Sequence, residues 1–151
     1  MKNDQIDELD QRILKLIGEN ARIPFLEVAR ECNVSGAAIH QRITKLMETG
    51  VIQGSKFIFD WNKIGYEASA MIGVNIPRSK PYSEIIEQLK EIPEVIECYS
   101  VSGEHDLLVK VVAHTNRDLQ AIIQNKLYQI GFDKLETIIL FEEIFCRQIP
   151  L

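Results

Sequence analysis

Cysteine and histidine are scarce in this sequence of 151 residues, which contains three of each. The cysteines, Cys32, Cys98 and Cys146, are widely spaced and lie within apolar patterns, so we expect buried, reduced thiols rather than a disulfide framework. No C-x-x-C pair and no cluster of histidines is visible, so the sequence predicts no metal site, no cofactor and no catalytic constellation. An enzyme is therefore disfavoured.

Long apolar runs are also missing. No segment approaches the ~18 uninterrupted apolar residues of a membrane span, and the start, M-K-N-D-Q-I-D-E-L-D, is too acidic and polar for a signal peptide. We therefore expect a cytoplasmic protein with no membrane partner. An apolar content of 46% is sufficient for a hydrophobic core in one domain or in two small ones.

Positive charge is in deficit, since the formal net charge is −5. This argues against a nucleic-acid partner, because phosphate groups favour a basic surface. The first 54 residues, however, carry seven basic and eight acidic side chains, whereas residues 55–151 carry ten and fourteen. No acid occurs between Ser35 and Met47, so a local positive face remains. We expect modest affinity for DNA from one copy, and hence dependence on several copies that bind together.

Residues 25–44 are predicted to form two short helices joined by a tight turn, the pattern of a helix-turn-helix. Apolar residues of the first helix recur at i, i+3, i+4 and i+7 from Phe25. Ser35 is a suitable N-cap for a second helix over residues 36–49, and Gly50 is suited to close it.

The second helix is predicted to face the core through Ile39, Ile43 and Leu46. Its opposite face begins with small residues, which allow close approach to a major groove. There, Gln41 is predicted to read a base edge, and Arg42 to contact phosphate together with Lys45. The predicted DNA-contacting residues are Ser35, Gly36, Ala37, Ala38, His40, Gln41, Arg42, Thr44 and Lys45. From these residues alone, an ordinary amphipathic helix with a solvated polar face is the alternative.

The segments on either side of this pair extend the prediction. Residues 7–19 are predicted to form a third helix, with Asp7 as its N-cap. The β-branched and aromatic residues 51–61 are predicted to be extended, as a wing or a linker strand. Residues 62–66 mark a plausible domain boundary.

The remainder of the chain is predicted to alternate in the order βαββαβ. This is the ferredoxin-like arrangement, in which helices cover one face of the sheet and leave the other bare. The last helix is expected to open at Asn116 as N-cap, and the last strand to cover residues 135–145. Because that strand is apolar at alternating and adjacent positions, we expect both of its faces to be buried and two sheets to dimerise.

Four segments of the sequence carry a family resemblance: I-D-E-L-D-Q-R-I-L-K-L, V-S-G-A-A-I-H-Q-R-I-T-K-L, G-V-I-Q-G and V-S-G-E-H-D-L-L-V-K-V. In this order and at these intervals they resemble the Lrp/AsnC, or feast/famine, family of transcriptional regulators, and the AsnC branch in particular. The resemblance implies an α+β protein. Its parts would be a winged helix-turn-helix domain (1–54), a linker strand (55–66) and a ferredoxin-like, ligand-sensing and oligomerisation domain (67–151). It also implies palindromic operator DNA, an amino-acid effector, and homodimers that assemble into octamers.

The same resemblance places the effector near the loop at residues 102–106, where Gly103 and Asp106 keep the family pattern Gly-x-x-Asp. Asp106 or Glu104 is a candidate partner for the ammonium group of an amino acid, and backbone N–H groups around Gly103 for its carboxylate. The predicted ligand-contacting residues are Tyr99, Ser100, Ser102, Gly103, Glu104, His105 and Asp106. Alternatively, Gly103 is only a turn glycine and Asp106 only caps the loop.

The sequence therefore predicts a transcriptional regulator that binds double-stranded DNA and responds to a small molecule. A second hypothesis is that the helix-turn-helix serves only assembly and the chain senses a small molecule through protein contacts. A third hypothesis, a catalytic cleft using His105 and Asp106, lacks a second convergent set of residues.

Overall fold

The computed structural model describes residues 6–147 and residue 149, and the chain divides into two compact units. The first comprises the residues up to Ile58 together with those from Cys146 onward. The second comprises Phe59–Phe145. None of the helices in the described part of the chain combines the length and the apolar character that crossing a bilayer requires.

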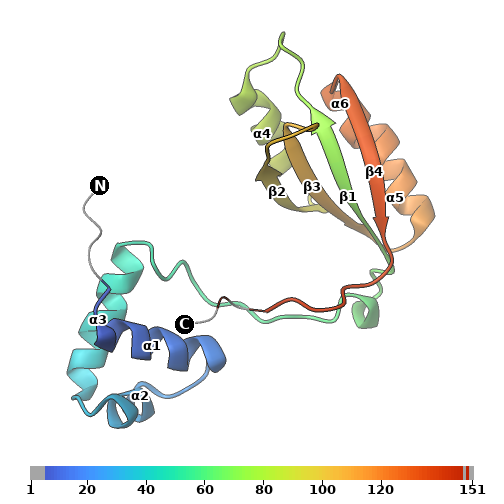
Figure 1. Ribbon diagram of the computed structural model, residues 1–151. Coiled ribbons are helices and arrows are strands. Elements are labelled where there is room, and N and C mark those ends of the chain that lie inside the picture. The colour runs from blue at the N-terminus through green and yellow to red at the C-terminus, as the bar shows by residue number, and fades with distance from the viewer. Residues whose placement is uncertain (1–5, 148, 150–151) are drawn as a thin grey trace. The chain divides into compact units, whose positions relative to one another are not determined.

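Three helices build the first unit: α1 (Glu8–Glu19), α2 (Phe25–Cys32) and α3 (Gly36–Glu48) (Figure 1). The predicted caps are confirmed. Asp7 and Asp10 form a capping box at the start of α1, in which the Asp10 N–H donates to Asp7 Oδ1 at 2.8 Å. Ser35 Oγ accepts from the Ala38 N–H at 3.2 Å, which satisfies a donor at the start of α3. Gly50 follows α3 with a φ of 75°, a conformation that favours glycine.

The three helices share one small hydrophobic core. Ile13 of α1, Val28 of α2 and Ile39 of α3 are each fully buried, and Cys32 is buried beside them as predicted. The turn between α2 and α3 is closed by Asn33, which has a φ of 55° and is the one described non-glycine residue in the left-handed region. Ile39, Ile43 and Leu46, the residues of α3 predicted from their spacing to face the core, are all buried.

The prediction of a strand after α3 is wrong, because residues 51–60 form neither strand nor helix. An extended segment becomes a strand only when its backbone pairs with another, and none of the described strands pairs with this one. Its first part lies against the helices: the Ile52 N–H donates to the Leu46 carbonyl at 2.9 Å, and Phe57 lies under the Arg22 guanidinium, 4.7 Å from the ring centre. A short 3-10 turn, Asn62–Ile64, follows.

The second unit confirms the predicted βαββαβ order. Its four strands form one antiparallel sheet in the order β2-β3-β1-β4. The elements are β1 (Ala68–Asn75), α4 (Tyr82–Lys90), β2 (Val95–Ser100), β3 (Leu107–Ala113), α5 (Asn116–Ile122), a π-helical turn (Ile123–Leu127), α6 (Tyr128–Ile130) and β4 (Lys134–Leu140).

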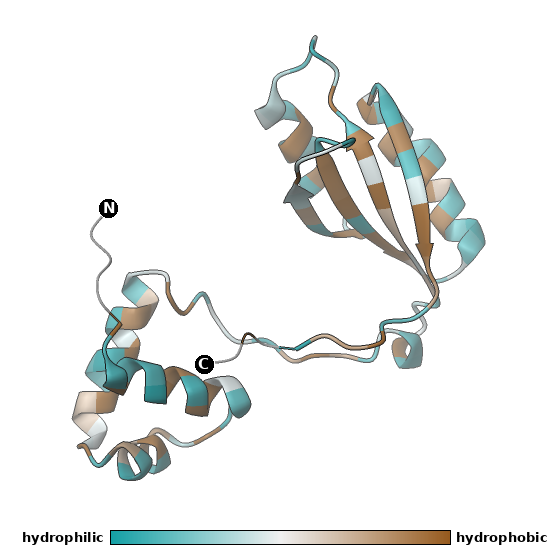
Figure 2. Cartoon of the chain, in the orientation of Figure 1, coloured by the Kyte–Doolittle hydropathy of each residue, from teal (hydrophilic) through white to brown (hydrophobic). Residues whose placement is uncertain are grey.

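Helices α4 and α5 cover one face of this sheet (Figure 1). Ile72 of β1 and Val109 of β3 point toward them and are fully buried, as are Ile85 of α4 and Leu119 of α5 to within 2%. The inward-facing positions of β1 are apolar throughout, as the two-residue period of a strand allows. The end of β4 is apolar at three adjacent positions, Ile138, Ile139 and Leu140, and is brown in Figure 2.

The other face of the sheet is bare in the single chain. Register places Met71 of β1 opposite Ile138 of β4, and the side chain of Ile138 is 51% exposed. The expectation that both faces of the last strand are buried requires a second chain on this face, so it stays a prediction. The strand also ends at Leu140, where its pairing with β1 stops, and not at Phe145.

Three smaller expectations are also corrected. The N-cap of α5 is Thr115 and not Asn116, because the Thr115 hydroxyl accepts from the Asp118 N–H at 3.1 Å. Cys98 lies on the edge strand β2, and Cys146 lies beyond the sheet. Both are exposed and not buried as expected, Cys98 because it lies in an open groove at the edge of the sheet.

Candidate DNA-binding helix and effector loop

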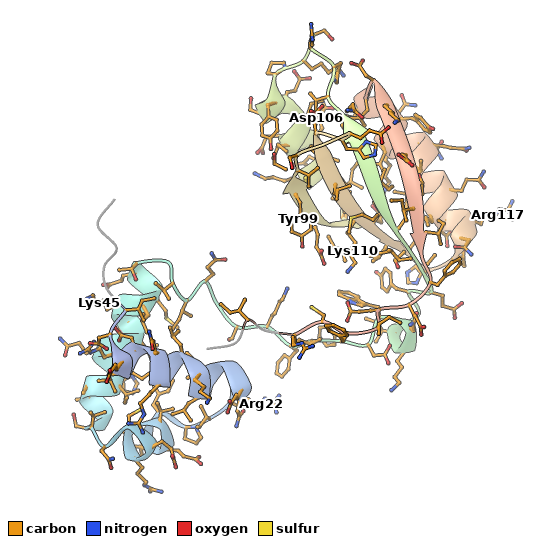
Figure 3. The ribbon with its side chains drawn as sticks, in the orientation of Figure 1. Arg22, Lys45, Tyr99, Asp106, Lys110 and Arg117 are labelled. Carbon is orange, nitrogen blue, oxygen red and sulfur yellow. The ribbon has the colours of Figure 1, made fainter. Side chains whose placement is uncertain are left out.

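The outer face of α3 presents most of the residues predicted to contact DNA. Ala37, His40, Gln41, Thr44 and Lys45 are exposed, and Lys45 projects from the C-terminal half of the helix (Figure 3). The remaining predicted residues are half-buried or occupied by structural contacts.

Two of those residues, together with His40, shape the helix-turn-helix itself. A Cβ atom on Gly36 would lie 3.3 Å from the Leu26 side chain, so glycine allows α2 and α3 to approach closely at the turn. The hydroxyl of Ser35 is used as the cap of α3. The His40 ring packs edge-on against Phe25 of α2, with ring centroids 4.8 Å apart, which fixes its orientation.

Arg42 occupies a different environment from the one expected of a phosphate contact. Its Nη1 lies 3.2 Å from both carboxylate oxygens of Asp10 and also pairs with Asp7. Asp10 is only 4% exposed and is the one described charged residue that is buried. Arg42 therefore ties α3 to the first turn of α1 and neutralises a buried carboxylate.

Asp7 and Arg42 stabilise each other's charged forms. The hydrogen bond from the Asp10 backbone, followed by that from Arg42, lowers the pKa of Asp7. Asp7 in turn raises the pKa of Arg42. Both groups are thus held in their charged forms.

The predicted effector loop connects β2 to β3 and is fastened to the end of β1. The Asp106 N–H donates to the Val74 carbonyl at 3.0 Å, and Asp106 Oδ2 accepts from the Ile76 N–H at 2.8 Å. Gly103 has a φ of 111°, which a side chain would strain. Asp106 thus caps the end of β1 and not its own loop, and it lies at that end of the sheet in Figure 3.

The two residues between Gly103 and Asp106 lie over the bare face of the sheet. Glu104 pairs with Lys134 of β4, which lowers the pKa of Glu104 and raises that of Lys134. The His105 Nδ1 lies 3.2 Å from Asn75 Oδ1, and its Nε2 lies 3.0 Å from Glu136 Oε2.

The structure does not bring all seven predicted ligand residues together. Tyr99 pairs with Leu108, so it lies on the bare face, where its hydroxyl donates to Glu97 Oε2 at 2.7 Å. Ser100 is the next residue and points to the other side, where it lines a groove between β2 and α4 with Cys98. Ser102 is exposed in the loop.

Sequence reasoning missed the partners of this loop. Asn75, Lys134 and Glu136 reach it because the register of β1 with β4 places Asn75 opposite Lys134 and Gly73 opposite Glu136. It also missed a set of potential metal ligands, since one ligand atom each from Glu104, His105 and Glu136 all lie within 4.8 Å of one another. No signal in the sequence indicates this pairing across 31 residues.

A capped helix-turn-helix with an exposed second helix, joined to a ferredoxin-like domain, defines a DNA-binding regulator with a separate ligand-binding domain. Two family models match the corresponding residues: winged helix-turn-helix DNA-binding over residues 6–53, and Lrp/AsnC ligand binding domain over residues 69–150. The chain belongs to the Lrp/AsnC family of transcriptional regulators. This membership makes it a regulator and not an enzyme.

Individual relatives agree with the family assignment. The chain is 34% identical over 145 residues to the regulatory protein AsnC of Haemophilus influenzae, covering 95% of this chain and 97% of that one. The structure of Escherichia coli AsnC matches with a TM-score of 0.88 at 30% identity, covering 96% and 98%. A feast or famine regulatory protein from Mycobacterium tuberculosis, complexed with L-methionine, shares the fold with a TM-score of 0.89 at 23% identity, covering 97% and 100%.

Replacement of Arg42 by Ala is expected to destabilise the helix-turn-helix by roughly 1–3 kcal/mol, because it leaves the buried Asp10 carboxylate without its charged partner. Lys45→Ala, on the exposed face of the same helix, is expected to change stability by less than about 0.5 kcal/mol. Urea unfolding of the full chain, followed by circular dichroism, measures both.

The ion pair of Arg42 with Asp7, the carboxylate whose pKa is lowered, predicts a dependence on pH. A carboxylate whose pKa is lowered by folding stabilises the folded state above its unfolded pKa, and this contribution disappears as the pH falls through the folded value. Wild type should therefore lose stability below about pH 4, and Arg42→Ala should lose less over the same range. Equal acid sensitivity in the two proteins would contradict the role given to Arg42.

Proposed function

We propose that this chain is an amino-acid-responsive transcriptional regulator that reads operator DNA with α3 and acts as a symmetric homo-oligomer. The observation that carries the proposal is the exposed outer face of α3, which has no acid from Gly36 to Met47 in a chain of net charge −5. A DNA partner is also the reason to propose a cytoplasmic location.

Gln41 and Thr44 are proposed to face bases, with the small residues Gly36 to Ala38 allowing close approach to the groove. Lys45 is proposed to contact phosphate, with His40 at the groove edge. Arg42 is a weaker candidate for phosphate, since two carboxylates already hold it. A two-fold dimer would impose half-sites about one helical turn apart, or a multiple of that spacing.

The effector is proposed to be an amino acid that binds at the loop between β2 and β3. Support comes from the Mycobacterium tuberculosis protein of the same fold, whose structure is complexed with L-methionine. In this chain, backbone N–H groups around Gly103 and the exposed Ser102 are suited to a carboxylate. The carboxylates of Glu104 and Asp106 each have one oxygen with an internal partner, Lys134 and the Ile76 N–H respectively, and are proposed to offer their other oxygen to an ammonium group.

Self-association is proposed to use the bare face of the sheet. A strip of apolar side chains lies on that face: Met71 of β1 is opposite Ile138 of β4, and Leu140 continues the row along β4. Ile138 is 51% exposed, and exposed apolar surface of this kind favours a protein partner over water. A second copy of the chain presents the same strip, so a two-fold pair satisfies both, and further association into octamers is proposed from the family resemblance.

The DNA-binding role predicts distinct effects for two residues of α3. Operator sequences are first selected from a random DNA library, and binding is then measured by fluorescence anisotropy at several salt concentrations. Lys45→Ala should weaken operator and random DNA alike and reduce the salt slope by about one, whereas Gln41→Ala should change the preference among sequences. Lys15→Ala, on the exposed side of α1, serves as the charge-matched control. Salt-insensitive or absent DNA binding by the oligomer would favour a sensor that acts through protein contacts alone.

The effector hypothesis predicts that at least one of the twenty amino acids binds the full chain with measurable heat, and that light scattering changes with it. Gly103→Ala should weaken this binding at least tenfold, because alanine strains the loop at a φ of 111°. Gly54→Ala, at a glycine of φ 148° in the first unit, is the control. If none of the twenty binds, the effector belongs to another chemical class.

The interface hypothesis predicts that Ile138→Lys lowers the mass of the assembly measured by size-exclusion chromatography with light scattering, because it buries a charge between two sheets. Tyr82→Lys is the matched control, since Tyr82 is 52% exposed but lies on α4, away from the bare face. Equal masses for wild type and Ile138→Lys would exclude this face as the interface.

A further inference from the structure

The hydrogen bonds around Asn75 determine which nitrogen of His105 carries a proton. The side-chain amide of Asn75 donates from Nδ2 to the Glu104 backbone carbonyl at 2.8 Å. A carbonyl only accepts, so the NH₂ group must face it, and the Asn75 oxygen must face His105. His105 Nδ1, 3.2 Å from that oxygen, must therefore carry a hydrogen and donate it to Asn75 Oδ1.

The other ring nitrogen, Nε2, faces Glu136. The Nε2 atom lies 3.0 Å from Glu136 Oε2. A carboxylate oxygen of Glu104 completes a set of three ligand atoms that all lie within 4.8 Å of one another. A metal ion bound at Nε2 would occupy the position of a hydrogen between the ring and Glu136.

The backbone of β1 limits the position of the His105 ring. A Cβ atom on Gly73 would lie only 2.4 Å from the ring, so the ring rests directly on the backbone of β1. The side chain of His105 is 13% exposed, and its Nδ1–H is oriented by Asn75. Metal-binding histidines are typically oriented by this kind of hydrogen bond to a carbonyl oxygen.

We propose that Glu104, His105 and Glu136 bind a divalent transition metal ion of the Zn²⁺ class. The ion would take His105 Nε2 and one carboxylate oxygen from each glutamate, with water in the remaining position. Glu104 would exchange its ion pair with Lys134 for the metal, which costs little because that pair is exposed. Imidazole with carboxylates suits zinc better than calcium or magnesium, which prefer oxygen ligands alone. Glu104 also belongs to the loop proposed to bind the effector, but metal binding at this site requires neither DNA nor an amino acid.

Calorimetric titration of the metal-free full chain with ZnCl₂ tests the site. We expect one ion per chain, and at least a tenfold loss of affinity in His105→Gln and in Glu136→Gln. His114→Gln is the matched control, because His114 contacts the Gly65 carbonyl outside the cluster and should leave zinc affinity unchanged.

A second variant separates geometry from ligand loss. Gly73→Ala keeps all three ligands but displaces the ring, so it should also weaken zinc binding by about tenfold or more, while circular dichroism confirms folding. In the wild-type chain, ¹⁵N spectra of the imidazoles should show His105 as the Nδ1–H tautomer, with an Nε2 resonance that shifts on addition of zinc.

Three outcomes would overturn the proposal. One is a doubly protonated His105 ring that zinc does not displace. Another is zinc binding that His105→Gln leaves intact. The third is a cluster that responds only to amino acids, which would identify its ligand as an ammonium group and not a metal.

Discussion

The antiparallel register of β1 with its two neighbours is the constraint on which the second unit depends. It directs Ile72 and Val74 toward the helices and turns Gly73 and Asn75 to the bare face. A slip by one residue would exchange the two faces and expose the core. The same register brings Glu136 opposite Gly73. Gly73 is the residue on which the His105 ring rests, and Glu136 is the carboxylate that the ring contacts. The pairing that forms the core therefore also positions the candidate site.

In the first unit, an ion pair between helices α1 and α3 has a comparable positioning role. Asp7 and Asp10 cap α1, and the same two carboxylates hold Arg42 of α3. The N-terminal cap of α1 therefore has a second role, because its carboxylates also orient α3, the helix proposed to read DNA. Because the hydrophobic core of three short helices is small, this link contributes to the angle at which the outer face of α3 is presented.

Features set by neighbours in the sequence were predictable, and those set by distant pairing were not. The caps Asp7, Ser35 and Gly50 were correctly predicted because each acts within one helical turn. Arg42 was predicted to contact phosphate because its helical position allows it, but its carboxylate partners lie more than 30 residues away. In the same way, the loop was identified from Gly103 and Asp106, while its partners on β1 and β4 depend on register. The family resemblance supplied the domain order and gave no information on these contacts.

Both self-association and ligand binding, the two activities proposed for the second unit, use the bare face of the sheet. Its apolar strip, with Met71 and Ile138 at the centre, is the proposed interface, and the cluster of Glu104, His105 and Glu136 lies at one end of the same face. A ligand that binds differently to the free and the covered face must shift the association equilibrium, and association must shift ligand affinity by the same factor. In a chain with net charge −5, DNA affinity depends on how many reading helices act together. If the proposed interface forms, control of assembly at this face would be sufficient to control DNA binding, without any change within α3 itself.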